Sequence, residues 1–249
     1  MVSIGVTLLS GGLDSTTVSA YAKHRTDRLT ALTFYYGQIH STELDSARQV
    51  SASLGIRHEL VDVSSFGKVA WYSALTSPDV IALPEERDAS QMGQSIPSSY
   101  VPLRNTFFIT VSAAYLESQA LWAIEQEKLK ADEIQATLFM APNAIDYSGY
   151  PDCRPEFFEK MKEVLKYGSK LWSEYNIPMN IETPIIHLSK GEIVRWAKDL
   201  DAPLTNTWSC YQGGPEPCGT CDSCILRAKG FQEAGHPDPL LVRLKGGTS

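Results

Sequence analysis

The sequence predicts an α/β protein built on a parallel sheet, with a cysteine-rich segment towards its C-terminal end. Residues 2–9 form an almost continuous apolar run, which is typical of a strand covered on both faces. Strand-like and helix-like stretches then alternate with short links, as in βαβ units. Four of the five cysteines fall within residues 210–224. These observations favour a parallel sheet followed by a metal-binding segment.

The N-terminal third predicts three strands and two helices. The strand at residues 2–9 is followed directly by Ser10-Gly11-Gly12, after which residues 13–23 are expected to be helical. Further strands are expected at residues 29–34 and 58–63, with a helix at 43–54 between them. Since parallel strands need crossover connections, this order predicts a Rossmann-like arrangement.

The remaining elements are less regular. Residues 77–99 contain three prolines and little periodicity, which predicts a mobile surface loop. A helix at 105–130, a strand at 134–140 and a helix from Pro155 to about Tyr175 are expected to follow. Ser189 and Glu192 form a capping box that opens a helix reaching about Leu200. The Gly-, Pro- and Cys-rich chain from Thr207 onwards predicts irregular structure.

These elements predict three parts of unequal size. Residues 1–205 are expected to form one α/β domain, residues 206–240 a metal-binding segment, and residues 241–249 a flexible tail.

Composition and charge exclude several classes of protein. Of the 249 residues, 43% are hydrophobic and 20% are charged, which is ordinary globular usage and excludes a disordered chain. No apolar run approaches the roughly 18 residues that cross a bilayer, and the N-terminus lacks the basic start of a signal peptide. The formal net charge of −7 disfavours sustained nucleic-acid binding. We therefore expect a soluble, cytoplasmic protein without a membrane partner.

The residues after the first strand have the composition of a phosphate-binding loop. Glycines expose successive backbone N–H groups, and the following helix adds its positive end. Hydroxyl groups supply further donors, and Asp14 is expected to hold Mg²⁺ beside the phosphate. The alternative is a tight turn in which Asp14 and Ser15 act as helix caps. The residues of this candidate phosphate-binding loop are Leu9, Ser10, Gly11, Gly12, Leu13, Asp14, Ser15, Thr16 and Thr17.

The cysteine cluster matches a closed zinc site. Cys210, Cys218, Cys221 and Cys224 offer four thiolates, the number that a structural tetrahedral Zn²⁺ requires. Four reduced thiols or an iron–sulfur cluster are the alternatives. Zinc is favoured because no other motif indicates redox chemistry, and with no ligand position left open its role is expected to be structural.

A third motif lies at residues 146–157. Aromatic, acidic and basic side chains here could stack on a heterocycle and bind its polar edge, although a solvated loop is the alternative. Cys153 is expected to be a buried thiol rather than a nucleophile, because no partner base is evident.

Taken together, these motifs resemble a known family. Ser10-Gly11-Gly12-Leu13-Asp14-Ser15-Thr16 resembles the pyrophosphatase loop (PP-loop) of enzymes that adenylate a substrate, which implies that residues 9–17 contact ATP and that the Mg²⁺ at Asp14 accompanies it. D-Y-S-G-Y-P-D-C-R-P-E-F from Asp146, T-W-S-C-Y-Q-G-G from Thr207 and C-G-T-C-D-S-C-I-L-R from Cys218 are similar to motifs of the 7-cyano-7-deazaguanine synthase family. The resemblance extends to about Pro239 and so covers nearly the whole chain.

The resemblance implies both a fold and a reaction. It implies an adenine nucleotide α-hydrolase-like fold, often as homodimers, and the ATP-dependent conversion of 7-carboxy-7-deazaguanine and ammonia to the nitrile. Arg104 and Lys190 match basic positions expected to face phosphate, and with Asp14 they are the expected catalytic residues. The substrate pocket is expected at the carboxyl edge of the sheet. Its expected residues are Tyr147, Asp152, Arg154 and Glu156.

Departures from the family's pattern leave alternatives open. Ile39, Ala141 and Pro142 replace residues common in the family. They motivate a related enzyme that stops at the amide or transfers the activated deazaguanine to an amine, for example on a protein. A tRNA-thiolating PP-loop enzyme and a non-enzymatic zinc module for nucleic acid are weaker alternatives. The former is disfavoured by the closed cysteine cluster and the negative charge, and the latter leaves the ATP loop unexplained.

Overall fold

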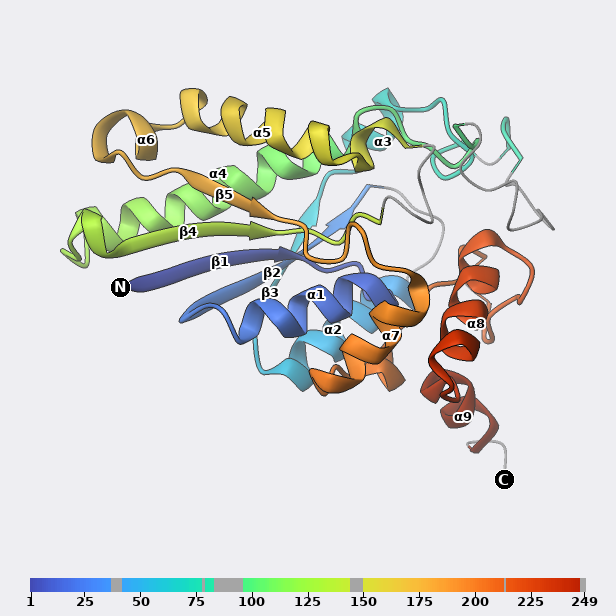
Figure 1. Ribbon diagram of the computed structural model, residues 1–249. Helices are drawn as coiled ribbons and strands as arrows, with labels where there is room; N and C mark the ends of the chain where they lie inside the picture. Colours follow the sequence, from blue (N-terminus) through green and yellow to red (C-terminus); the bar gives the residue numbers. More distant parts are fainter. Residues whose placement is uncertain (37–41, 78, 83–95, 144–149, 213, 247–249) are drawn as a thin grey trace.

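The fold is a parallel sheet between two layers of helices, with its carboxyl edge facing the C-terminal part of the chain (Figure 1). A computed structural model describes residues 1–36, 42–77, 79–82, 96–143, 150–212 and 214–246. Most of the expected loop at 77–99 and all of residues 37–41 lie outside these ranges, so the mobility of that loop stays a prediction.

The sheet has five strands in the order β3-β2-β1-β4-β5, and all neighbouring pairs are parallel. The chain connects β1, β2 and β3 towards one edge and then returns beside β1 with β4. The carboxyl ends of β1 and β4 therefore lie at the point where the strand order reverses, which is where open α/β sheets place ligands. The predicted parallel sheet is confirmed, and β5 is an addition to it. The strands are β1 (Val2–Leu8), β2 (Arg28–Tyr35), β3 (Arg57–Asp62), β4 (Ile134–Phe139) and β5 (Met179–Glu182).

Helices cover both faces of the sheet (Figure 1). One face carries α1 (Leu13–Lys23), α2 (Thr42–Leu54) and α7 (Lys190–Asp199), and the other carries α4 (Arg104–Glu125), α5 (Pro155–Gly168) and α6 (Lys170–Tyr175). The other helices are α3 (Ser64–Val69), α8 (Asp222–Ala234), α9 (Pro239–Gly246), and the 3₁₀ turns η1 (Ala131–Glu133), η2 (Pro151–Cys153) and η3 (Leu204–Asn206).

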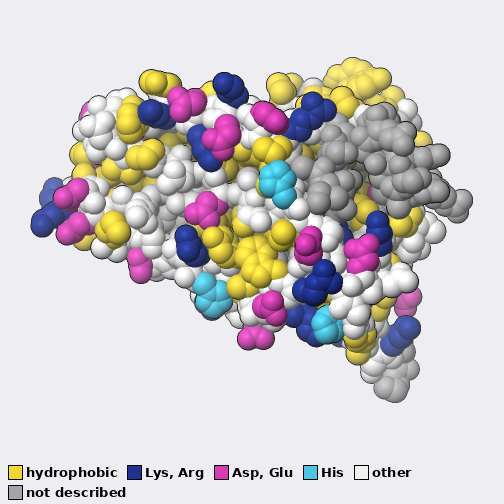
Figure 2. Space-filling model, viewed as in Figure 1, with side chains coloured by type: hydrophobic (Ala, Val, Ile, Leu, Met, Phe, Trp, Pro, Cys, Tyr) yellow, Lys and Arg dark blue, Asp and Glu magenta, His cyan; other side chains and the backbone are white. Residues whose placement is uncertain are grey.

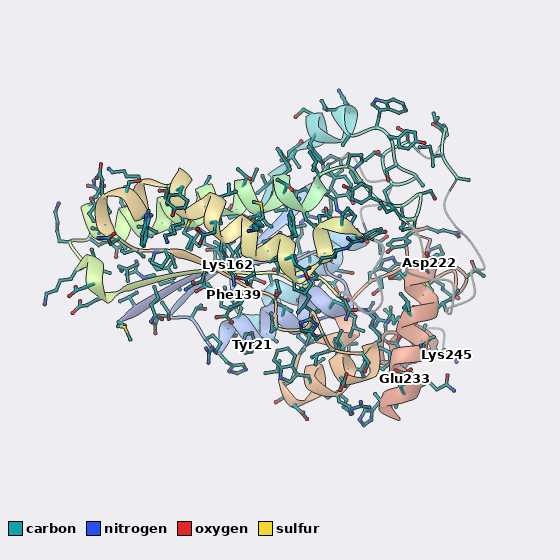
Figure 3. All side chains as sticks on the ribbon, turned by 45° about the horizontal axis from the view of Figure 1, so that its top comes forward. Tyr21, Phe139, Lys162, Asp222, Glu233 and Lys245 are labelled. Carbon is teal, nitrogen blue, oxygen red and sulfur yellow. The ribbon has the colours of Figure 1, made fainter. Side chains whose placement is uncertain are left out.

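Apolar burial holds the layers together. Val6 and Leu138 of the central strands and Leu116 of α4 are all fully buried in the larger core. On the opposite face, Tyr21 of α1 contacts the ring of Phe139 edge-on, with centroids 6.1 Å apart (Figure 3). Each fully buried large apolar side chain contributes roughly 1.5–3 kcal/mol. These two cores fix the helices that carry the residues at the carboxyl edge.

Two expected helices differ from the structure. The helix expected at 105–130 ends at Glu125, and Lys128 just beyond it has a left-handed backbone, with φ of 65°. The helix expected from Pro155 to Tyr175 is divided at Ser169, which is extended and whose hydroxyl accepts the Trp172 N–H at 3.3 Å. The capping box formed by Ser189 and Glu192 is confirmed.

The expectation of an irregular chain from Thr207 is wrong, because α8 and α9 occupy much of it. Asp222 and Glu233 mark the two ends of α8 (Figure 3). Its buried face includes Asp222, Arg227 and Gly230, so an apolar stripe does not reveal it. Residues 241–246 of the expected flexible tail belong to α9, and residues 247–249 lie outside the described residues.

One helix among the described residues, α4, is long and apolar enough to cross a membrane by length and composition. Its buried residues, including Ile109 and Leu116, pack against the sheet in the larger core. In this structure α4 is therefore a layer helix of an α/β protein.

Candidate functional site

The loop between β1 and α1 is shaped by Gly11. Its φ of +86° lies in the left-handed region that favours glycine. A Cβ on Gly11 would also lie 2.7 Å from the Glu43 carbonyl oxygen and from the Ala47 amide nitrogen of α2. On the opposite side, the Trp208 N–H donates to the Gly11 carbonyl at 2.8 Å. The loop is thus held between α2 and the chain that leads into the cysteine cluster.

Hydroxyl groups organise the rest of the loop. The Ser15 hydroxyl lies 3.0 Å from the Ser10 hydroxyl and donates to the Gly12 carbonyl at 3.2 Å. Thr16 and Thr17 are fully buried inside the fold, and the Thr17 hydroxyl donates to the Leu13 carbonyl within α1. Of the residues expected to contact ATP, those that line a cavity are Leu9, Ser10, Gly12, Leu13, Asp14 and Ser15.

Two adjoining cavities follow the loop, with volumes of about 310 Å³ and about 190 Å³. The larger cavity has aromatic and apolar walls, formed in part by Phe34, Tyr36 and Phe108. The smaller cavity is lined by Lys190, Arg227 and serine hydroxyls. The first suits a flat ring and the second an anion. Among the described residues, six line both cavities: Ser10, Asp14, Ser15, Glu43, Ala141 and Tyr211.

Asp14 and Lys190 meet in a partly buried ion pair. The Lys190 Nζ donates to Asp14 Oδ1 at 3.0 Å and to Oδ2 at 2.8 Å, and the two side chains are 7% and 21% exposed. Gly230 of α8 makes room for this lysine, because a Cβ there would collide with the Lys190 side chain. Two of the three expected catalytic residues are therefore brought together, although the sequence did not predict that they pair.

Arg104, the third expected catalytic residue, lies at the larger cavity. It is the first residue of α4, follows Leu103 in a left-handed conformation, and donates to the Tyr36 side chain. Tyr150 and Asp152 also lie within its electrostatic reach. The guanidinium is thus separated from Lys190, one group facing each cavity.

The expected substrate residues differ in their burial and in their contacts. The Asp152 carboxylate is buried and accepts the Asn105 backbone N–H at 3.2 Å, so it caps α4. Burial raises the pKa of Asp152, although Asn105 and Arg104 oppose that shift. Arg154 and Glu156 are exposed, and neither is among the described lining residues. Tyr147 lies outside the described residues. Their contact with substrate stays a prediction.

Cys153 is a buried thiol at the wall of the larger cavity. Burial, with the nearby Asp152 carboxylate, raises its pKa to about 12. The thiolate that a nucleophile requires is therefore disfavoured at neutral pH.

The four clustered cysteines converge as expected. The Sγ atoms of Cys210, Cys218, Cys221 and Cys224 lie within 4.8 Å of one another. A tetrahedral zinc with bonds of roughly 2.3 Å separates its sulfurs by roughly 3.8 Å, so the set fits one ion after small adjustments. The N–H groups of Gln212 and Cys218 each donate to Cys210 Sγ at 3.4 Å, as in sites that stabilise thiolates. This cluster could hold one metal ion, as zinc would require.

Several lining residues were not predicted from the sequence. Glu43 stands in the first turn of α2, and its only sequence signal is an acidic residue at the start of a helix that follows a strand. Arg227 of α8 donates to both oxygens of Asp238, at 2.6 and 2.9 Å, and to the Thr207 hydroxyl at 2.9 Å. No pattern in the sequence joins these distant residues.

Glu43 gives a pH-dependent stability prediction. Burial raises its pKa from 4.5 to about 7, although Arg104 opposes the shift. A carboxyl group with a raised folded-state pKa costs nothing below the unfolded value and destabilises the fold increasingly as the pH rises from about 4.5 to 7. Glu43→Gln should therefore stabilise the protein at pH 8 by up to about 3 kcal/mol and leave it unchanged at pH 4. Thermal melting at both pH values measures this, and equal melting temperatures at pH 8 would contradict it.

Charges on the surface are mixed in sign. On the face drawn in Figure 2, basic and acidic side chains are interspersed, and the basic ones form no continuous stripe. With the net charge of −7, this face does not resemble a surface for nucleic-acid backbones.

Comparisons with known proteins give a family match and several relatives. The family described as "Queuosine biosynthesis protein QueC" matches residues 4–235. A 7-cyano-7-deazaguanine synthase from Thermoplasma acidophilum is 44% identical over 94% of this chain and 90% of its own. One from Trichodesmium erythraeum is 41% identical over 95% and 99%. Among solved structures, an NH3-dependent NAD synthetase from Campylobacter jejuni has a TM-score of 0.41 and 18% identity, covering 80% of this chain and 65% of its own.

Proposed function

The chain belongs to the QueC family of queuosine biosynthesis proteins, and we propose that it converts 7-carboxy-7-deazaguanine and ammonia to 7-cyano-7-deazaguanine with ATP. The observation that carries this proposal is the identity of 44% over 94% of the chain to a curated 7-cyano-7-deazaguanine synthase. The geometry supports it, because an anion-binding cavity and a cavity with aromatic walls adjoin along one PP-loop.

The chemistry requires two activations by ATP. A carboxylate becomes an acylating agent when its oxygen attacks the α-phosphorus and pyrophosphate leaves. Ammonia then displaces AMP and loses a proton, which gives the amide. The amide oxygen is adenylated in turn, with release of pyrophosphate and one N–H proton, and loss of AMP and the second N–H proton leaves the nitrile. Each activation needs the growing charge on the departing pyrophosphate to be stabilised.

We assign that stabilisation to groups along the smaller cavity. The loop N–H groups and the Ser10 and Ser15 hydroxyls would bind phosphate oxygens, and Lys190 would turn from Asp14 to the pyrophosphate. Asp14 would then hold Mg²⁺, which supplies charge neutralisation when it accompanies ATP. Arg104 lines the larger cavity and would bind the α-phosphate or the substrate carboxylate.

Recognition of the deazaguanine is assigned to the larger cavity. Phe108 and Phe34 stack with a centroid distance of 4.2 Å and present a flat apolar wall. Tyr147, Asp152, Arg154 and Glu156 are proposed to contribute as the family resemblance implies. For Asp152 the support is indirect, because its carboxylate caps the helix that carries Arg104.

The metal is proposed to be structural zinc. All four ligands would be cysteine thiolates, so no coordination position is left for substrate. The cluster would hold Cys210 and Tyr211 in the cavity wall. We further propose free ammonia as the nitrogen donor, a homodimer as the assembly and the cytoplasm as the location. No observation favours transfer to a protein or to tRNA.

Product analysis tests the proposal. Purified protein incubated with ATP, Mg²⁺, 7-carboxy-7-deazaguanine and ammonium should form the nitrile, with AMP and pyrophosphate as the nucleotide products. Without ammonium, pyrophosphate should still be released, but only when 7-carboxy-7-deazaguanine is present. An amide as the final product would favour the alternative enzyme, and ADP with inorganic phosphate as the nucleotide products would contradict the PP-loop assignment.

A further inference from the structure

Glu43 is a half-buried carboxylate at the junction of the two cavities. It stands in the first turn of α2 and lines both cavities, a property that it shares with Asp14 of α1. The activated carbonyl carbon must lie between the phosphates in the smaller cavity and the ring in the larger one. A side chain that lines both cavities is therefore next to the reacting atoms.

Among the described residues, the other candidate bases are engaged in other contacts, lie outside the two cavities or have an unfavourable pKa. Both oxygens of Asp14 accept from Lys190. Asp152 caps α4 and does not line either cavity. The Cys153 thiol is disfavoured as a thiolate, and no histidine among the residues that the structure describes lines either cavity. Glu43 is thus the remaining carboxylate there without an ion-pair partner at salt-bridge distance.

We propose, on the basis of the proposed function, that the Glu43 carboxylate removes protons from the substrate nitrogen. In amide formation, ammonia bonds to the acyl carbon, the bond to AMP breaks, and one N–H proton passes to Glu43. In nitrile formation, adenylation of the amide oxygen displaces pyrophosphate and passes one N–H proton to Glu43, which gives the adenylated imidate. Its remaining N–H proton then passes to Glu43 as the carbon–oxygen bond to AMP breaks. Solvent then removes each proton from the carboxyl group, so atoms and charge balance.

The surroundings of Glu43 favour this role. Burial raises its pKa to about 7, near neutral pH, where a general base is most effective. Arg104 of α4 opposes the shift, and Tyr36, the residue directly after β2, also interacts electrostatically with Glu43. Asp14 and Tyr211 complete the charged and titratable groups that line the junction among the described residues.

The test separates adenylation from nitrogen chemistry in Glu43→Gln. ATP–pyrophosphate exchange that depends on 7-carboxy-7-deazaguanine reports adenylation, and it should stay within about threefold of the parent. Amide formation and conversion of added amide to nitrile should each fall by at least about 100-fold. Asp45→Asn is the matched control, because it removes a carboxylate from the same helical turn that is exposed and pairs with Arg48. Its rates should equal those of the parent.

A pH profile adds an independent readout. Rates expressed per concentration of free ammonia should rise as the pH passes about 7 in the parent and in Asp45→Asn, because the base must be unprotonated. The Glu43→Gln profile should lack that rise. Formation of amide and nitrile at the parental rate by Glu43→Gln would overturn the role of Glu43 alone. Loss of exchange, or a higher Mg²⁺ requirement, would also overturn it by assigning Glu43 to the nucleotide. A parent without carboxylate-dependent exchange would overturn the proposed function itself.

Discussion

Asp14→Asn is expected to lower turnover by at least about 1,000-fold while the protein stays folded. Asp14 lines both cavities and pairs with Lys190 at 2.8 Å, so its loss removes the proposed Mg²⁺ ligand and leaves a buried ammonium without its partner. The rate of pyrophosphate release measures the catalytic effect. Asp132→Asn, an exposed change outside the site, is the control for lost charge and should behave as the parent.

Stability and catalysis can be separated in the same pair. Removing one partner of a buried ion pair costs about 3–5 kcal/mol, whereas replacing both by neutral groups is often close to neutral. Since the Asp14 side chain is 21% exposed, Asp14→Asn should lower the free energy of unfolding by about 3 kcal/mol or less. The double variant Asp14→Asn, Lys190→Gln should regain stability in denaturant titrations and stay inactive. Pyrophosphate release by Asp14→Asn at the parental rate would contradict both the metal role and the anion role of this cavity.

Cys221→Ser is expected to release the metal and unfold the C-terminal segment. Zinc bound by four thiolates contributes folding free energy directly, so a lost ligand costs several kcal/mol. Cys221 is the N-cap residue of α8, which connects the metal site to helix packing. Zinc content by elemental analysis and the thermal melting temperature should both fall. Cys153→Ala is the matched control, because the fifth cysteine lies outside the cluster and its loss should leave the zinc content unchanged.

The metal should also affect nucleotide binding. The Trp208 N–H donates to the Gly11 carbonyl, and Trp208 lies two residues before Cys210. A metal bound by the cluster should therefore help to fix the position of the PP-loop. ATP affinity measured by calorimetry should therefore fall in Cys221→Ser. Freshly purified parent protein that contains no zinc would contradict the metal assignment.

Local patterns in the sequence were sufficient for the strands and for two of the binding motifs. Alternation of apolar strands with helices predicted β1 to β4, because strand and helix periodicity is visible within a few residues. β5 has only four residues and follows a helix closely, so its stretch of sequence is too short to show a strand pattern. α8 was missed for a related reason, because polar residues such as Asp222 and Arg227 form part of its buried face.

The sequence by itself determined the parallel α/β fold, the glycine loop after β1 and the four cysteines that could hold zinc, because each depends on residues that are close in the chain. Only the tertiary structure decided that Lys190 pairs with Asp14, that Asp152 caps α4 and that Glu43 stands where the two cavities meet. Lys190 and Asp14 are 176 residues apart. Contacts between such distant residues depend on the strand order and on how closely neighbouring helices approach one another. Gly230 is an example, because it lets α8 pack against Lys190. Local periodicity predicts neither the strand order nor the distance between helices, because both are set when the packed layers bring distant segments to one edge of the sheet.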